Sequence, residues 1–280
     1  MTLPDRSVLQ WVGRSLPGLR RWDPIGGATT AALWKVSDGD GSWVVKVFAN
    51  PAFVAEYPDC VDHAVASMQF VRANSDLRVP EVVDADSTGD LAGYPAILMT
   101  ALGGVPLEVP TRRVFDRIID VADQVHGLPA AGFKWHHHRY NDPTDTFAPE
   151  WFGDPGLFAE LAARSAAAVS DEVFIHRDFH PGNLLFDGDL VVGTVDWDYA
   201  CIGPSGEDFG RTWLNLAADY GQRISTVFAS RAARRLDPAW VAATWLDWLG
   251  FYEGGEVRRW VTLEERLVFE SVGRWAVGLR

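Results

Sequence analysis

Two short polar segments near the middle of the chain carry the side chains most able to do chemistry. Asp178 and Asn183 stand five residues apart in the first segment, which lies between two apolar runs and has the profile of a loop held by buried elements. Asp196 follows thirteen residues after Asn183, at the end of another apolar run. Two carboxylates and an amide oxygen can accept a proton and hold a hard cation such as Mg²⁺.

The residues between Asn183 and Asp196 are typical of a β-hairpin. Two strand-like runs flank the turn signal Asp-Gly-Asp at 187–189. A turn centred just after Asp189 would place Asn183 and Asp196 opposite each other on antiparallel strands. The alternative is that an Asp-Gly turn with flanking acids is only a surface turn.

The chemistry expected of these residues follows from their types. Asn183 and Asp196 are predicted to hold Mg²⁺, which usually keeps other ligand positions for phosphate and water. Asp178 is then predicted to accept a hydroxyl proton while the metal holds a phosphoryl donor.

The pattern His176-x-Asp178-x-x-x-x-Asn183 followed by Asp196 resembles the catalytic residues of protein kinases and of small-molecule kinases of the aminoglycoside phosphotransferase and choline kinase type. The His-Pro-Gly-Asn sequence at 180–183 is more similar to the small-molecule branch. The lysine that usually follows two residues after the catalytic Asp in a protein kinase is absent, as is a closing Ala-Pro-Glu segment.

This resemblance implies an α+β, two-lobed protein-kinase-like fold. We expect a small antiparallel β-sheet lobe with a helix at residues 1–102, which binds nucleotide, and a larger, mainly α-helical lobe at 103–280, which carries catalysis and acceptor binding. The residues agree with this division, because five strand-like runs precede residue 102 and helical periodicity dominates beyond residue 111.

The expected nucleotide contacts of the first lobe begin with Gly26, Gly27 and Lys46. A glycine-containing turn between strands lets backbone amides approach phosphates, although such a pair alone is more often a plain hairpin turn. Lys46 shares a strand face with Val44 and Phe48, and its ammonium could hold phosphates as a point charge. The resemblance assigns Lys46 that role.

A kinase-like lobe also needs an acid on its helix to orient this lysine. The helix predicted at about 58–73 has no glutamate at the expected place. Asp62 is the best candidate, with Asp59 and Glu56 behind it.

The segment after the fifth strand is the predicted hinge. The resemblance implies that adenine hydrogen-bonds to backbone groups between Thr100 and Leu102. Backbone contacts leave no side-chain signature, and the neighbouring Leu98 and Met99 could equally be sheet core.

Several polar residues of the second lobe allow more than one reading. The triplet His136-His137-His138 is expected in a solvated loop, because zinc sites use spaced ligands. Asp208 is an N-cap candidate, whereas the resemblance implies that an acid near this point braces the catalytic loop from beneath. Asp198 could contact the acceptor or lie behind the metal ligands.

Composition limits the function classes. The chain has 280 residues and a net charge of −13, which argues against nucleic acid as a ligand and is compatible with a cationic substrate or with solubility alone. No apolar run reaches the ~18–20 residues that span a membrane, and the beginning of the chain shows no secretory signal. With only Cys60 and Cys201, a reduced cytoplasmic setting is the simplest expectation.

The sequence therefore predicts an ATP- and Mg²⁺-dependent phosphotransferase that modifies a hydroxyl of a small molecule, with a cationic one favoured. Aminoglycoside-like antibiotics, amino alcohols and sugar metabolites are open possibilities, as are GTP in place of ATP and any oligomeric state. The alternatives are an inactive nucleotide-binding relative that acts as a scaffold and, less favoured, a protein kinase.

Overall fold

A computed structural model shows that the chain folds into two compact units. The structure describes residues 3–26, 30–140, 142–145, 148, 152–253 and 263–279, with the side chains of 249–253 left out. Unit 1 comprises Met1–Gly104 and Val192–Tyr199, and unit 2 comprises Val105–Val191 and Ala200–Arg280. The predicted functional lobes, 1–102 and 103–280, stay a prediction.

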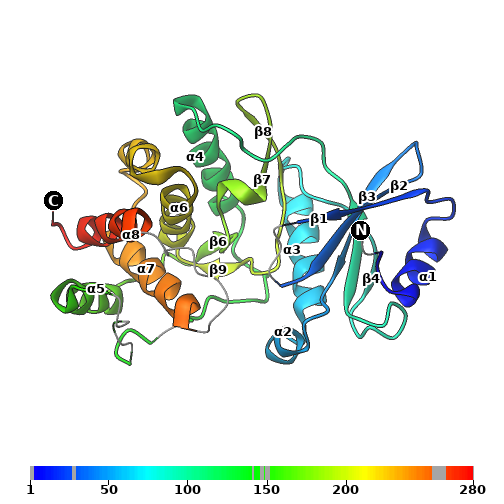
Figure 1. Cartoon of the computed structure of the whole chain (residues 1–280), viewed down its shortest axis with the longest axis horizontal. Coiled ribbons are helices and arrows are strands. Elements are labelled where there is room, and N and C mark those ends of the chain that lie inside the picture. Colours follow the sequence, from blue (N-terminus) through cyan, green and yellow to red (C-terminus); the bar gives the residue numbers. More distant parts are fainter. Residues whose placement is uncertain are drawn as a thin grey trace. The chain divides into compact units, whose positions relative to one another are not determined.

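Unit 1 is built on a five-stranded antiparallel sheet with the order β1-β2-β3-β5-β4 (Figure 1). The sequence prediction of such a sheet is confirmed. Its strands are β1 (Arg21–Ile25), β2 (Ala32–Ser37), β3 (Ser42–Val47), β4 (Val82–Asp86) and β5 (Ala96–Thr100), and its helices are α1 (Arg6–Ser15), α2 (Pro51–Glu56) and α3 (Cys60–Asn74).

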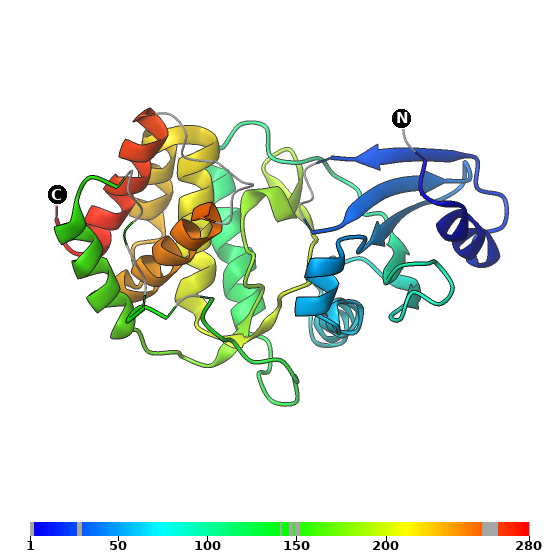
Figure 2. The same ribbon diagram turned by 60° about the horizontal axis from the view of Figure 1, so that its bottom comes forward.

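The two faces of this sheet have different partners. Figures 1 and 2 show α1 and α3 on opposite sides of it. Trp11 and Val12 of α1 pack in one buried cluster with Val45 and Val47 of β3. Because successive strand residues point to opposite faces, Lys46 is directed to the other side, where the sheet contacts α3 through β4 and β5. This alternation buries a lysine in a strand.

The predicted hairpin is present as β7 (Leu184–Asp187) and β8 (Leu190–Thr194), which form a two-stranded sheet. Its turn is one residue earlier than expected. Asn183 lies before β7 in the short helix η1 (Pro181–Asn183), and Asp196 lies after β8. The prediction that these two residues face each other on the strands is therefore wrong.

Unit 2 is mainly helical, as predicted. Helix α6 contacts α4, α7 and α8, and Figure 2 shows α5 to α8 as neighbouring coils. The helices are α4 (Arg112–His126), α5 (Pro155–Ala166), α6 (Ser205–Arg231), α7 (Pro238–Glu253) and α8 (Leu263–Ala276), and β6 (Val173–Ile175) pairs with β9 (Cys201–Gly203). Among the described residues, no helix combines the length and apolar character needed to cross a membrane.

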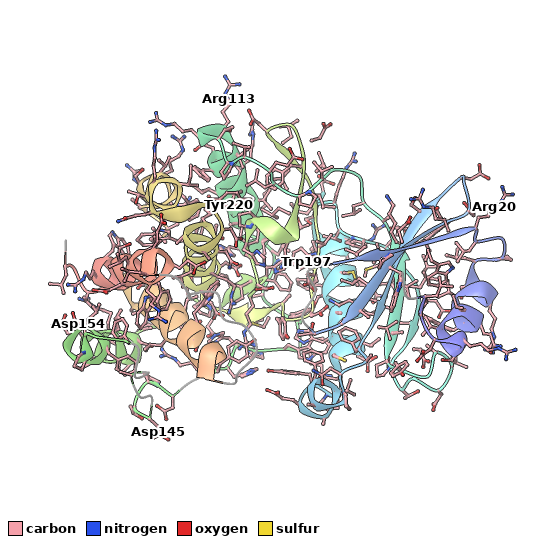
Figure 3. All side chains as sticks on the ribbon, viewed as in Figure 1. Arg20, Arg113, Asp145, Asp154, Trp197 and Tyr220 are labelled. Carbon is pink, nitrogen blue, oxygen red and sulfur yellow. The ribbon has the colours of Figure 1, made fainter. Side chains whose placement is uncertain are left out.

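Side-chain caps and close contacts fix these helices. Asp154, labelled in Figure 3, accepts a hydrogen bond from Leu157 N at the start of α5, and it also contacts Arg274 of α8. Tyr220 of α6, labelled in the same view, donates a hydrogen bond to Leu107 O at 2.8 Å. These contacts connect α5 to α8 and α6 to the segment that precedes α4.

Candidate active site

Asp178 and Asn183 lie together in the loop that follows β6. The Asn183 amide nitrogen donates to the Asp178 backbone oxygen at 2.9 Å and to its carboxylate Oδ2 at 3.0 Å. Asn183 is buried, while 27% of the Asp178 side chain is exposed. The buried amide therefore fixes a carboxylate that stays open to a ligand.

Basic side chains lie close to the Asp178 carboxylate. His180 Nε2 lies 3.6 Å from Oδ2, and Arg211 Nη1 lies 3.5 Å from Oδ1. Burial raises the pKa of Asp178, but the charges of His180, Arg211 and His176 outweigh burial and hold this pKa far below its usual range. An ionised carboxylate can only accept hydrogen bonds, so Asp178 is suited to receive one from a hydroxyl.

Asp208 braces the backbone of the same loop. Its fully buried carboxylate accepts hydrogen bonds from His176 N at 3.0 Å and Arg177 N at 2.7 Å, and His126 Nε2 lies 2.9 Å away. The N-cap interpretation is wrong, because α6 begins at Ser205 and Asp208 lies within its first turn. The bracing role that the resemblance implied is confirmed.

A buried ionic cluster lies beside this brace. Glu207 Oε2 is 2.5 Å from His137 Nε2, and its Oε1 is 3.7 Å from Arg211 Nη2 and 3.8 Å from Arg177 Nε. Burial raises the pKa of Glu207, but the bond from His137 and the two guanidinium charges lower it overall. His136 and His138 are exposed as predicted, whereas the solvated-loop expectation is wrong for His137.

Lys46 contacts two carboxylates in unit 1. Its Nζ lies 2.5 Å from Asp196 Oδ1 and 2.5 Å from Asp198 Oδ2. Burial lowers the pKa of Lys46, but the two acids outweigh it and raise this pKa above its usual value. The predicted partner Asp62 is exposed on α3 and accepts a hydrogen bond from Ser87 instead. The expectation of Asp62 as the partner is therefore wrong.

The other predicted nucleotide contacts have different surroundings. Gly26 is exposed directly after β1, and Gly27 lies outside the described residues. Thr100 ends β5, and its amide donates to Glu81 O at 2.9 Å, so this N–H already has a partner. Leu102 follows the strand, and its backbone takes part in no hydrogen bond with the described parts of the chain. Adenine contacts at this segment stay a prediction.

The predicted metal ligands belong to different units and have suitable chemistry. Asn183 donates through its amide nitrogen, which leaves its Oδ1 for a cation, and 39% of the Asp196 side chain is exposed. In the described ranges no group of three or more His, Cys, Asp or Glu residues could hold a metal. An amide oxygen and a carboxylate oxygen are both ligand types that Mg²⁺ accepts, and their binding of one shared ion stays a prediction.

Backbone strain occurs at both segments. Arg177 has φ 67° and Asp196 has φ 65°, a left-handed conformation that side-chain-bearing residues seldom adopt. Such conformations cost about 1–3 kcal/mol each and concentrate at functional sites. Their position directly beside Asp178 and at a predicted metal ligand agrees with a functional role for these segments.

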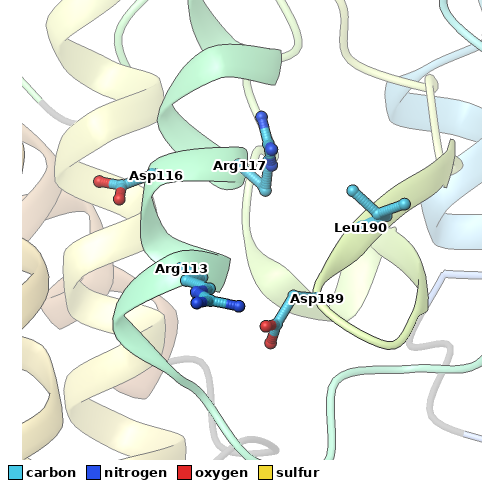
Figure 4. A pocket seen from close by; sticks show the side chains of 5 residues that line it. All are labelled: Arg113, Asp116, Arg117, Asp189 and Leu190. Atoms are coloured by element: carbon cyan, nitrogen blue, oxygen red, sulfur yellow. The ribbon is translucent and has the colours of Figure 1, made fainter.

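A surface pocket of about 420 Å³ lies elsewhere in unit 2. Figure 4 shows its lining by α4 and the tip of the β7–β8 hairpin; the residues are Arg113, Asp116, Arg117, Asp189 and Leu190. Asp116 pairs with Arg231, and Asp189 accepts a hydrogen bond from Thr111. The pocket contains none of the predicted site residues.

Sequence comparison identifies a family. A model of the phosphotransferase enzyme family matches residues 21–246. A homoserine kinase of Methylocella silvestris is 33% identical over 129 residues, which are 41% of this chain and 39% of that protein. The chain therefore spans about two fifths of the length of this curated relative.

Structural comparison identifies the fold. A thermostable mutant of aminoglycoside phosphotransferase APH(4)-Ia, in ternary complex with ADP and hygromycin B, has a TM-score of 0.67 at 13% identity and covers 97% of this chain and 98% of its own. Aminoglycoside phosphotransferase APH(3'')-Id from Streptomyces rimosus has a TM-score of 0.58 at 18% identity, covering 85% and 94%. The predicted protein-kinase-like fold is confirmed.

Proposed function

Because the chain belongs to the phosphotransferase enzyme family, we propose that it transfers the γ-phosphate of ATP to a hydroxyl of a small molecule. The observation that carries this proposal is the Asp178 carboxylate, which is fixed by Asn183, flanked by His180 and Arg211, and partly exposed. A carboxylate in this setting can orient an acceptor hydroxyl and take its proton as the phosphorus–oxygen bond forms.

The remaining roles follow from side-chain chemistry. Lys46 would hold donor phosphates through its ammonium, and Asn183 and Asp196 would hold Mg²⁺. The metal would neutralise charge on the phosphates and orient them. Gly26, Gly27, Thr100 and Leu102 remain the proposed contacts of the nucleotide, with Leu102 as a backbone donor that has no partner within the described residues.

One relative and one structural neighbour indicate which class of acceptor molecule to propose. One relative is a homoserine kinase, and one structural neighbour holds hygromycin B. Homoserine and hygromycin B share hydroxyl groups on a molecule that carries an ammonium group. The net charge of −13 favours such a cation, because a negative field raises the local concentration of positively charged ligands. We therefore propose a hydroxylated amine as the acceptor.

The alternatives are less favoured. An inactive nucleotide-binding relative was suggested by the missing helix glutamate, but Asp196 and Asp198 both contact Lys46, which removes this argument. A protein kinase lacks support, because the chain has no Ala-Pro-Glu segment after Asp196.

A coupled ADP-release assay tests the proposal. ATP with Mg²⁺ is offered together with homoserine, hygromycin B, choline or a protein substrate, and GDP release is followed where GTP replaces ATP. We expect acceptor-dependent ADP release with at least one hydroxylated amine. The proposal would be rejected if no small acceptor stimulated ADP release, or if only the protein substrate did.

A substitution then tests the assigned base. Asp178→Asn should lower kcat by about 10²–10⁴-fold, because it removes the proton acceptor while it preserves the shape of the side chain. Asp187→Asn, in the exposed end of β7, is the matched control and should retain full turnover. Wild-type turnover by the Asp178 variant would refute the role of Asp178.

A further inference from the structure

Lys46 has two acidic contacts with different accessibility. The Asp196 side chain is 39% exposed, whereas the Asp198 side chain is only 4% exposed. An exposed carboxylate can exchange its partner for a cation from solvent, but a buried one must keep a fixed partner to offset its desolvation. Asp196 can therefore exchange Lys46 for another cation, whereas Asp198 must keep it, although each carboxylate lies 2.5 Å from the same ammonium.

The backbone around Asp198 is anchored on both sides within unit 1. Trp197 is fully buried and its Nε1 donates to Thr194 O at 3.0 Å, while Thr194 N donates to Arg78 O at 2.9 Å. Figure 3 labels Trp197. These bonds fix the residue immediately before Asp198, so its carboxylate is held in place by the fold.

Aromatic contacts anchor the other side. Tyr199 meets Tyr57 edge-on with ring centroids 5.9 Å apart, Tyr57 meets Phe53 at 5.0 Å, and Phe53 stacks on Phe48 at 5.8 Å. Phe48 follows Lys46 by two residues, and Lys46 Nζ lies 5.3 Å from its ring centroid. The row of rings thus connects the residue after Asp198 to the segment that carries Lys46.

We propose that Asp198 is the positioning residue of Lys46, and that it takes the place of the acid that α3 lacks. In this arrangement Asp198 holds the ammonium permanently in the sheet, and Asp196 is released from Lys46 when it serves as a metal ligand. The proposal rests on the proposed function for its link to phosphates and Mg²⁺, but the pairing of Lys46 with Asp198 is testable without either.

The first test is a double-mutant cycle on the full chain without Mg²⁺ or nucleotide. Asp198→Asn should lower Tm by at least about 5 °C, because it leaves a buried ammonium with one exposed partner. Lys46→Met combined with Asp198→Asn should lower Tm by clearly less than the sum of the two single changes. Asp23→Asn breaks an exposed ion pair with Arg21 and is the matched control, with little change in Tm.

The second test uses the Mg²⁺ dependence of turnover. In Asp198→Asn, Asp196 is the carboxylate partner that Lys46 keeps among the described residues, and Lys46 competes with the metal for it. The Mg²⁺ concentration for half-maximal turnover should therefore rise by about tenfold, corresponding to about 1.4 kcal/mol. Loss of packing alone would lower turnover without this change in metal dependence.

The possible outcomes separate this inference from the proposed function. Additive Tm changes in the cycle, or an unchanged Mg²⁺ requirement in an active Asp198→Asn variant, would overturn the role of Asp198. A coupling of Lys46 with Asp62 in the equivalent cycle would assign the partner to α3 instead. Absence of kinase activity in the wild type would reject the proposed function while the cycle still reports on the pairing.

Discussion

At the residue scale, single carboxylates organise the loop that carries Asp178. Asp208 accepts two backbone N–H groups and contacts His126, so one side chain satisfies donors that would otherwise be buried without partners. It also fixes Arg177, whose φ of 67° is costly for a residue with a side chain. A carboxylate offers two oxygens for these donors, whereas an amide offers only one.

Asp208→Asn should therefore destabilise the loop. Loss of an acceptor for a buried N–H costs about 1–3 kcal/mol, and Tm should fall by roughly 2–4 °C per kcal/mol. We expect kcat to fall because Asp178 loses its fixed position. Asp120→Asn, at an exposed acid of α4, provides the comparison and should change neither quantity. Equal Tm and kcat values for the two variants would contradict the bracing role.

Sequence spacing predicts some residue contacts and misses others. Asp178 and Asn183 lie in one short loop, and the structure brings them into contact. The partners Asp198 of Lys46 and His137 of Glu207 come from distant segments, so only packing of the folded chain brings them together. The sequence contained a signal for Asp198, because it lies two residues after Asp196, but it did not identify the partner.

At the element scale, the helix predicted at about 58–73 is present as α3, Cys60–Asn74, and the predicted hairpin is present as β7 and β8. Strand β4 is the least typical of the strands, since it spans Val82–Asp86 and contains two acidic residues. Acidic residues made this strand hard to recognise. Asp84 accepts a hydrogen bond from Ser15, and Asp86 accepts three from the backbone of the following turn. Tertiary partners therefore allow acids in a strand that propensity disfavours.

Close packing of α6 against α7 gives an element-scale prediction. A Cβ at Gly206 would lie 2.8 Å from the Cβ of Trp240, so Gly206→Ala should force the helices apart and cost about 1–3 kcal/mol. Gly13 of α1 has open space around it, and Gly13→Ala should stabilise by up to about 1 kcal/mol through helix propensity. Thermal unfolding of both variants checks this, and a similar sign for both would contradict it.

At the scale of the whole molecule, the family and fold were predictable from few residues. The loop pattern and Asp196 indicated a kinase-like fold, although sequence identity to the structural neighbours is only 13–18%. Function selects the types and spacing of such residues, whereas many apolar combinations can fill the same core. The acceptor is less predictable, because its contacts are grafted on a fold that serves many substrates.

The whole-molecule charge predicts how stability depends on pH. The net charge of −13 and the sequence pI of about 4.9 mean that self-repulsion decreases as pH falls from 7 toward 5. Below that range, buried carboxylates with lowered pKa values determine stability. Glu207 is one of them, because it is fully buried against His137 and two guanidinium groups.

The linkage between proton binding and folding gives the direction in which stability changes with pH. The folded-state pKa of Glu207 lies below its ordinary value of 4.5, so the unfolded chain binds its proton first as pH falls. The stabilisation is complete above about pH 4.5 and is lost as pH falls through the folded-state pKa. At pH 7 the free energy of unfolding of Glu207→Gln should be about 3–5 kcal/mol lower than that of the wild type. This difference should narrow below pH 4.5.

Thermal or urea unfolding between pH 7 and pH 3 measures this gap. Glu160→Gln, which changes an exposed carboxyl of α5, is the control and should follow the wild type throughout. A gap for Glu207→Gln that stays constant down to pH 3 would show that the carboxylate charge contributes nothing to stability. A narrowing gap with unchanged behaviour of the control would identify Glu207 as a source of acid sensitivity, since its charge offsets the guanidinium groups beside it.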